Sequence, residues 1–276
     1  MRCTAWRFRR FQAQGRVKGK LLWSLVVLVA LVFGGALMAK PAMRWMWGAP
    51  NSSNWSRVDN VSRVDNVSRI DNVSRIEFPF DGRLIDGVPE PWTLRVIRGK
   101  EQVSVSDSEG LLGQKVLCLR AESSHYLLLN PSKQFDPKEL PILAWSWKAV
   151  VLPTKGDVRT HGATPFVGDN RNDKAAQILI GFEGDKVLMY VWDTSAPVGT
   201  EVEEWSPVAK IMTHVIESGP LHVGEWRDYR VNIYDDFIRR YGSPPTKVIG
   251  VSVQINSNHT GSVSAAMIGK IRAESR

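Results

Sequence analysis

The sequence is poor in the residues and motifs on which disulfide-rich domains and many catalytic sites depend. Only two cysteines occur, Cys3 and Cys118, so a hydrophobic core rather than a disulfide framework must hold the fold. The five histidines are scattered, with no His-Glu-x-x-His motif. A Gly-x-Ser-x-Gly elbow, a Ser-x-x-Lys motif and a P-loop are also missing. We therefore expect no resident cofactor, and the motifs identify no catalytic nucleophile.

Acidic residues are absent from the first twenty positions, which hold seven cations: Arg2, Arg7, Arg9, Arg10, Arg16, Lys18 and Lys20. The apolar run that follows, residues 21–38, would span about 27 Å as a helix, close to the roughly 30 Å of a bilayer core. Its length, and the bulky Leu37 near any cleavage site after Ala39, favour an anchor over a cleaved signal peptide. We predict a cytoplasmic segment over residues 1–20 and a single membrane-spanning helix over residues 21–39, with the remainder on the far side.

The net charge of +8 is nearly accounted for by these seven cations. The rest of the chain is close to neutral, so its overall basic character reflects membrane topology. A nucleic-acid-binding domain would need a basic face of its own. We expect the membrane as a partner through residues 21–39, and no nucleic acid.

Residues 40–76 have the composition of a linker and contain a tandem hexapeptide. The unit Ser-Arg-Val-Asp-Asn-Val begins at Ser56 and Ser62, recurs with isoleucine at Ser68, and ends as Ser-Arg-Ile-Glu-Phe from Ser74. Its apolar residues recur every three positions, a period that fits neither a helix nor a strand. Three units are also too few for a solenoid core. We predict a polar spacer without stable structure.

Residues 77–276 are enough for one domain with a single core. Runs typical of strands alternate with turns rich in Gly, Pro, Asn and Asp, and residues 229–241 have the apolar spacing of a helix. The pattern predicts a mainly β domain, a jelly-roll-like antiparallel β-sandwich with one late α-helix. The strands are expected at residues 93–97, 115–121, 125–129, 142–150, 177–182, 186–192, 208–217, 247–255 and 263–272.

Several short motifs in a fixed order resemble the bacterial DUF3047 domain, a family of unknown function. They are Trp145-Ser-Trp-Lys148, Asp173-Lys-Ala-Ala-Gln-Ile178, Tyr190-Val-Trp192, Tyr234-Asp-Asp-Phe237 before Tyr241-Gly242, and Gly250 through the polar turn at residues 256–261. The resemblance covers roughly residues 78–272 and implies a sandwich-like fold in a bacterial envelope protein. Family members commonly have Asp-x-Asp in the last turn, where this chain has Asn256 and Asn258, which weakens a metal role there. Together with the anchor, the resemblance implies a protein of the inner membrane with a periplasmic domain.

Two aromatic pairs are candidates for a ligand platform. Trp145 and Trp147 lie two positions apart on a predicted strand, so both rings share one face, as do Tyr190 and Trp192. Aromatic rings on a sheet can stack on sugars, but they can equally form the core. Both interpretations stay open. Trp147, next to Lys148, is the better ligand candidate, and Trp145 the better core candidate.

An oxygen-rich loop runs from Asp169 to Asp173, with Asn170 and Asn172 between them. Ca²⁺ takes six to eight oxygen ligands, and Arg171 occupies the third position of the corresponding EF-hand pattern. We therefore interpret the loop as a solvated turn and predict no metal site. Any metal ligation would fall to Asp169 and Asp173.

The sequence favours a membrane-anchored envelope protein whose β-sandwich binds a ligand, most plausibly an envelope glycan, without catalysis. Trp145, Trp147, Tyr190, Trp192, Asn256 and Asn258 form the expected ligand-binding set. One alternative is an enzyme that acts on envelope polysaccharide through paired carboxylates, and another is a protein-interaction scaffold. Acidic pairs such as Glu203–Glu204 and Asp235–Asp236 occur, but glycosidase carboxylates are defined by a separation of about 5–10 Å in space.

Overall fold

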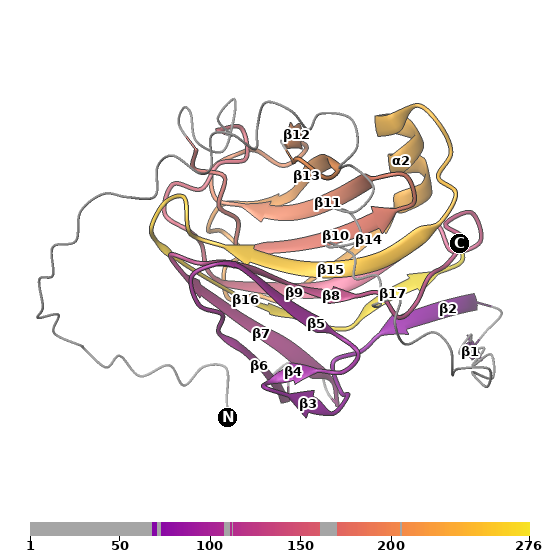
Figure 1. Ribbon diagram of the computed structural model, residues 1–276, viewed down its shortest axis with the longest axis horizontal. Coiled ribbons are helices and arrows are strands. Elements are labelled where there is room, and N and C mark those ends of the chain that lie inside the picture. Colours follow the sequence, from indigo (N-terminus) through magenta and orange to yellow (C-terminus); the bar gives the residue numbers. More distant parts are fainter. Residues whose placement is uncertain (1–67, 71–72, 108–110, 112, 161–169, 205) are drawn as a thin grey trace, which may run out of the picture.

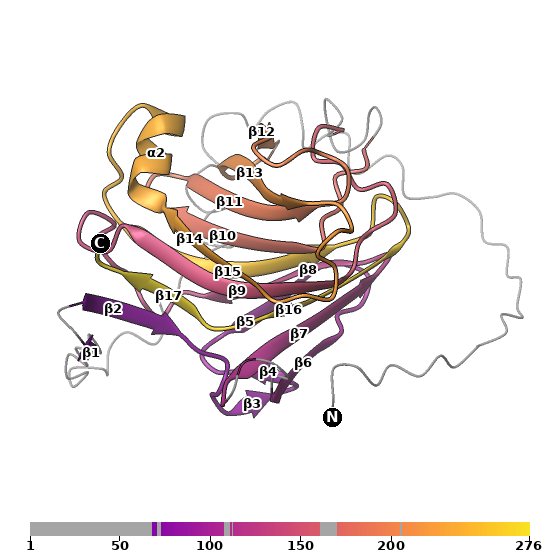
Figure 2. The same ribbon diagram turned by 180° about the vertical axis from the view of Figure 1, so that it is seen from behind.

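The computed structural model describes residues 68–70, 73–107, 111, 113–160, 170–204 and 206–276. Two large β-sheets pack face to face as a sandwich (Figure 1; Figure 2). The predicted cytoplasmic segment, the predicted span and most of the linker lie outside the described residues. None of the helices within the described ranges has the length and hydropathy needed to cross a membrane.

The first sheet has eight strands. Its order is β1 (Ser68–Ile70), β2 (Val73–Phe78), β17 (Ile271–Glu274), β9 (Ile142–Val151), β16 (Val263–Ile268), β7 (Lys115–Glu122) and β6 (Val103–Asp107), with β14 (Arg227–Asn232) paired to β9. β9 is long enough to pair with β14 along one edge and with both β16 and β17 along the other.

The second sheet has seven strands, in the order β12 (Glu201–Glu204), β13 (Lys210–Ser218), β11 (Lys186–Asp193), β10 (Ala176–Phe182), β15 (Val248–Asn256), β8 (His125–Asn130) and β5 (Thr93–Arg98). β11 and β13 run parallel, whereas its other paired strands are antiparallel. A small hairpin joins β3 (Leu84–Ile85) to β4 (Val88–Pro89). The predicted antiparallel sandwich with a jelly-roll-like arrangement is thus confirmed at this level.

The core lies between the two sheets and follows the alternation of the strands. From β9, Leu143, Trp145 and Trp147 point inward, whereas Ser146 points outward and donates a hydrogen bond to Asp228. A second apolar cluster, which includes Leu179 and Met189, lies on the opposite face of the second sheet. The second sheet is therefore packed on both faces.

The helix is shorter than predicted. α2 (Ile233–Tyr241) begins four residues later than expected, because Tyr229 and Val231 alternate inward on β14. The Asn232 side chain caps the helix by accepting a hydrogen bond from the Asp235 amide at 3.0 Å. Gly242, with φ of 74°, ends it. α2 stands beside β11 and β13 at one end of the sandwich (Figure 1), where the Tyr241 hydroxyl donates to the carbonyls of Val187 and Lys210.

Two predicted boundaries also shift. The expected strand over residues 263–272 is interrupted at Gly269, whose backbone packs so closely on Ser146 that a Cβ would lie 3.2 Å from its side chain. The predicted boundary between linker and domain falls inside β2, which pairs with β17. The last hexapeptide therefore belongs to the first sheet. For residues 68–70 and 73–78 alone, this corrects the prediction of a spacer without stable structure, because backbone pairing does not depend on an apolar period of two. The earlier units of the repeat lie outside the described residues.

Candidate functional site

A continuous series of buried or half-buried polar side chains crosses the second sheet, and we call it the polar row. Its members are His125, Asn172, Asp173, Lys174, Gln177, Glu204, Thr213, Gln254 and Asn256. Its strand residues occupy the face that points away from the first sheet. On β10, for example, Ile178 and Ile180 enter the core, which places Gln177 on the same face as Leu179.

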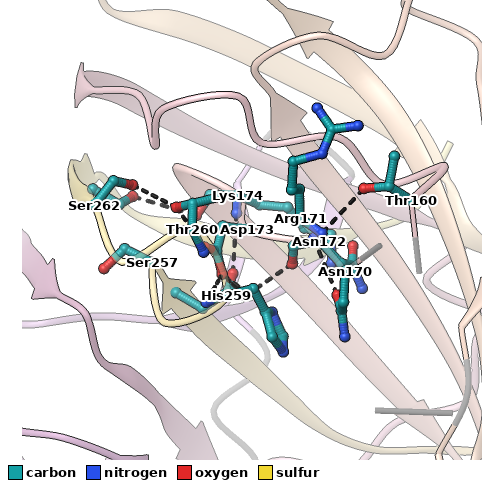
Figure 3. A network of polar contacts seen from close by, with 12 residues as sticks. Thr160, Asn170, Arg171, Asn172, Asp173, Lys174, Ser257, His259, Thr260 and Ser262 are labelled. Carbon is teal, nitrogen blue, oxygen red and sulfur yellow. Dashed lines mark hydrogen bonds and ion pairs between the residues drawn. The ribbon is translucent and has the colours of Figure 1, made fainter. Parts of the chain in front are cut away.

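Asp173 joins the polar row to the turn at residues 256–261. Its buried carboxylate accepts hydrogen bonds from Asn256 Nδ2 at 2.8 Å and from the amide and hydroxyl of Thr260 at 2.7 and 2.8 Å. The amide and Nδ1 of His259 lie 3.3 Å from the same carboxylate (Figure 3). Burial alone would raise the pKa of Asp173, but the donors from His259 and Thr260 lower it below its usual value. Asp173 is therefore a charged clamp on the turn at residues 256–261.

Side-chain amides continue the row across β15 and β10. Asn256 Oδ1 accepts hydrogen bonds from Gln177 Nε2 at 2.8 Å and from the Lys174 amide at 3.0 Å. Gln177 Oε1 in turn accepts from Gln254 Nε2 at 3.0 Å. These bonds fix the orientation of each amide, so the row presents defined donors and acceptors.

His125 stands next to Gln254 at the β8 end of the row. Burial, assisted by the positive charge of Lys174, lowers the pKa of its imidazole to about 4. At neutral pH the ring is therefore uncharged. It can serve as a hydrogen-bonding group but brings no charge to the site.

The opposite end of the row is a buried ion pair. Lys174 Nζ lies 2.9 and 3.1 Å from the two carboxylate oxygens of Glu204, and both side chains are nearly inaccessible. Glu204 also accepts hydrogen bonds from Asn172 Nδ2 at 2.8 Å and Thr213 Oγ1 at 2.5 Å. Burial would raise the pKa of Glu204, but the charge of Lys174 and these donors lower it. The pair is charged and internally compensated.

Three buried atoms around the row have no hydrogen-bond partner within the described residues: Asn172 Oδ1, Asn258 Oδ1 and His125 Nε2. Asn258, His125 and Gln254 are partly exposed. Buried polar atoms are normally satisfied by protein, water or ligand. Among the described residues, the hydrogen bonds of the fold therefore leave the acceptors Asn172 Oδ1 and Asn258 Oδ1 unused.

The predicted aromatic platform lies elsewhere. Trp145, Trp147, Tyr190 and Trp192 are at most 2% exposed and belong to the core between the sheets. The rings of Trp145 and Trp147 are 5.5 Å apart, and both contact Tyr229. Stacking on a sugar requires an exposed ring face. Their burial therefore corrects the expected exposure of Trp147 and fits the core interpretation of both pairs.

The polar candidates are divided between the row and its surroundings. Asn256 is a member of the row, and Asn258 lies in the adjoining turn. Both carboxylate oxygens of Asp173 accept hydrogen bonds from neighbouring residues. Asp169 lies outside the described residues. In the described part of the chain, no group of three or more His, Cys, Asp and Glu side chains is arranged to hold a metal.

Sequence reasoning missed Lys174, Glu204, His125, Gln177 and Gln254. Part of the signal was present, because Gln254 and Asn256 alternate with the core residues Val253 and Ile255. The pairing of Lys174 with Glu204 had no comparable signal, because the two residues come from separate segments.

Comparison with protein-family models identifies a family for this chain. Residues 90–272 match the model of a family described as "Protein of unknown function (DUF3047)". No curated protein sequence matches the chain.

Several solved structures are similar at low identity. The glycoside hydrolase domain of Spr0440, Endo-D, from Streptococcus pneumoniae R6 is 9% identical with a TM-score of 0.35, covering 66% of this chain and 21% of that one. The Cel12A catalytic domain of Humicola grisea is 9% identical with a TM-score of 0.39, covering 72% and 97%. The xyloglucanase domain of NopAA from Sinorhizobium fredii is 13% identical with a TM-score of 0.28, covering 75% and 93%. At these values the similarities carry no functional argument, and the chain spans about a fifth of the first structure.

Proposed function

Since the chain belongs to the DUF3047 family, whose function is unknown, we propose a role from its own chemistry: a non-catalytic binding domain of the bacterial envelope whose polar row binds a glycan. Two features together support this most. The charged side chains Lys174 and Glu204 pair with each other, whereas buried acceptor atoms beside them have no hydrogen-bond partner within the described residues.

Catalysis is the weaker proposal because the carboxylates around the row are committed to structural bonds. Glu204 bonds Lys174, Asn172 and Thr213, and Asp173 bonds the turn. Nearby, burial raises the pKa of Asp193, but its two oxygens accept hydrogen bonds from the amides of residues 158, 195 and 196. A general acid must be able to give its proton to a substrate. None of these three carboxylates is placed to do so.

The chemistry of the row fits a ligand with many hydroxyl groups. Amide oxygens such as Asn172 Oδ1 and Asn258 Oδ1 accept hydrogen bonds, and sugar hydroxyls donate them. Lys174 is neutralised by Glu204, so no free charge at the row favours an anionic ligand. We infer a neutral or weakly charged oligosaccharide as the ligand class.

The envelope location rests on the seven leading cations and the apolar run at residues 21–38. Alkaline phosphatase fused after Arg276 should be active, whereas a reporter that works only in the cytoplasm should be inactive there. The reverse pattern would contradict the proposed topology. Recovery of the chain in membranes with an intact N-terminus would support the anchor over a cleaved signal.

Binding can be tested by calorimetry on the full chain in detergent, with cellotetraose and soluble peptidoglycan fragments as probes. We expect Gln254→Ala to weaken binding at least about tenfold, the change that corresponds to roughly 1.4 kcal/mol. Ser252→Ala is the matched control, because Ser252 lies two positions away on the same face of β15 but outside the row. The control should bind as the wild type does.

Three results would overturn the proposal. The first is a folded wild type that binds neither cellotetraose nor the peptidoglycan fragments, and the second is equal affinity of the wild type and Gln254→Ala for them. The third is release of reducing ends from a polysaccharide that is lost when Glu204 is substituted, because it would support an enzyme.

A further inference from the structure

Two tyrosines between the sheets donate their hydroxyl hydrogen to a carboxylate. Tyr190, on β11, donates to Asp236 Oδ2 at 2.5 Å, and Tyr229, on β14, donates to Glu217 Oε2. Burial and the adjacent carboxylates raise the pKa of both phenols, so each phenol keeps its proton at neutral pH. Each hydroxyl is thus a proton donor that already contacts a base.

The same two tyrosines are joined by a path of aromatic rings. The ring centroids of Tyr229 and Trp145 are 5.8 Å apart in a stacked arrangement, and those of Trp145 and Tyr190 are 5.7 Å apart. Both spacings fall within the range of direct ring contact, about 4.5–7 Å. Tyr229 is half-buried and Tyr190 is 1% exposed. The path therefore leads from the surface into the core.

Phenol and indole rings are the groups of this path that can lose a single electron. Loss of an electron makes a phenol strongly acidic, so the loss is easiest where a base accepts the hydroxyl proton. Glu217 and Asp236 are placed to accept that proton from Tyr229 and Tyr190. Arg239 Nη2 lies 2.5 Å from Asp236 Oδ1, which leaves Asp236 Oδ2 directed at the phenol.

We propose that Tyr229, Trp145 and Tyr190 form an oxidation relay, which carries an oxidising equivalent from the surface to Tyr190. A one-electron oxidant, either a diffusing radical or a high-potential metal complex, takes an electron at Tyr229. An electron from Tyr190 then passes through Trp145 and restores Tyr229. This inference concerns the core and does not depend on the proposed glycan binding.

The relay leaves one neutral radical in the protein. Tyr229 gives its proton to Glu217 when it is oxidised and takes that proton back when it is reduced. In total, one electron moves to the oxidant, one proton moves from the Tyr190 hydroxyl to Asp236 Oδ2, and no bond between heavy atoms forms or breaks. Because Tyr190 is buried, water-borne radicals do not reach its ring. The tyrosyl radical at Tyr190 should therefore be long-lived.

Two other tyrosines provide matched controls. Tyr126 is buried like Tyr190, and Tyr241 is half-buried like Tyr229. The hydroxyl of each donates to two backbone carbonyls, which are far weaker bases than a carboxylate. Tyr241 contacts the ring of Phe237, which does not give up an electron readily. Neither tyrosine should hold a stable radical.

The test is one-electron oxidation of the full chain in detergent by photogenerated tris(bipyridine)ruthenium(III), followed by electron paramagnetic resonance. The wild type should give a long-lived tyrosyl signal that narrows when the tyrosine rings are deuterated. Tyr190→Phe should lose this signal, and Asp236→Asn should lose most of it. Tyr126→Phe and Tyr241→Phe should retain it. Tyr229→Phe should slow its formation, because the ring stays but the phenol at the surface is missing.

Circular dichroism shows for each variant that the sandwich is folded. A signal that is unchanged in Tyr190→Phe, or that is lost equally in Tyr126→Phe, would overturn the assignment of the radical to Tyr190. An unchanged signal in Asp236→Asn would overturn the role of the carboxylate as proton acceptor. Formation at the wild-type rate in Tyr229→Phe would overturn the path from the surface.

Discussion

The aromatic core between the sheets and the polar row on the second sheet are both buried, but they are satisfied in different ways. Trp145, Trp147 and Tyr229 contact one another as rings, and the indole N–H groups of both tryptophans have no partner in the described residues. In the row, polar atoms are joined by short hydrogen bonds and one ion pair. The core thus depends on shape and apolar area, whereas the row depends on complementary partners.

This difference changes where ligand recognition should be sought. The aromatic residues that resemble a sugar platform in sequence are used to hold the sheets together. The residues that resemble ordinary strand-end polar groups retain acceptors beside a partly exposed surface. Substitutions in the two regions should therefore separate stability from binding, and the following predictions go from the largest expected effect to the smallest.

Trp147→Ala should have the largest effect on stability. The side chain is fully buried, so its removal should lower the free energy of unfolding by about 4–5 kcal/mol through lost contacts and a cavity. Denaturant unfolding followed by circular dichroism measures this. Leu221→Ala, at a position 79% exposed, is the control and should change little. A stable Trp147→Ala protein would show that the core is not the main support of the sandwich.

Lys174→Met should lower the free energy of unfolding by about 3 kcal/mol, because it leaves the Glu204 carboxylate buried without its cation. The double variant Lys174→Met/Glu204→Leu should recover most of the loss, since no uncompensated charge remains. Both are measured by the same unfolding curves. If the single and double variants are equally unstable, the unpaired Glu204 charge is not the cause of the lost stability.

Acidification should lower the free energy of unfolding through His125, a member of the polar row. The pKa of His125 is about 4 in the folded chain and near 6.5 when unfolded, so between these values only the unfolded chain binds the proton. Stability should therefore fall as the pH drops through this window, by about 2 kcal/mol between pH 7 and pH 5.

His125→Gln should remove most of that slope in unfolding curves taken across the window. His214, whose pKa is also lowered by burial, should account for part of what remains. An unchanged slope in His125→Gln would locate the titrating group outside the row.

Gln254→Ala should have the smallest effect on stability, about 1 kcal/mol, because it removes one hydrogen bond from a partly exposed side chain. Thermal unfolding of this variant, compared with Ser252→Ala, measures the difference. A loss as large as that of Trp147→Ala would mean that the row supports the fold in the same way as the core.

Much of the fold could be predicted from local patterns. Strands such as β10 and β11 were located to within a residue, because apolar residues bounded by Gly and Asp turns define them. β14 was missed because it leads directly into α2. Tyr229 and Val231 alternate as in a strand, but together with the apolar residues of α2 they also fit the spacing of one longer helix. Two-periodic and 3.6-periodic patterns cannot be separated over so few residues.

The site was less predictable, for a different physical reason. Asp173 and Thr260 are joined by a short hydrogen bond but lie 87 residues apart. Which strand neighbours which is decided by the sheet topology, and no local pattern around Lys174 indicates that Glu204 will be its partner. The sequence also could not decide whether Trp145 and Trp147 are buried, since two tryptophans on one face of a strand can lie in the core or at the surface.

The parallel pairing of β11 with β13 has a consequence for the order of assembly. Parallel neighbours cannot be joined by a tight turn, so residues 194–209 must cross over before β13 can pair. That crossover contains β12, which brings Glu204 to Lys174. A chain in which β13 has not yet paired therefore holds Lys174 without its carboxylate. In such a chain the position of Lys174 lacks its counter-charge, so the addition of β12 and β13 both extends the second sheet and completes the row.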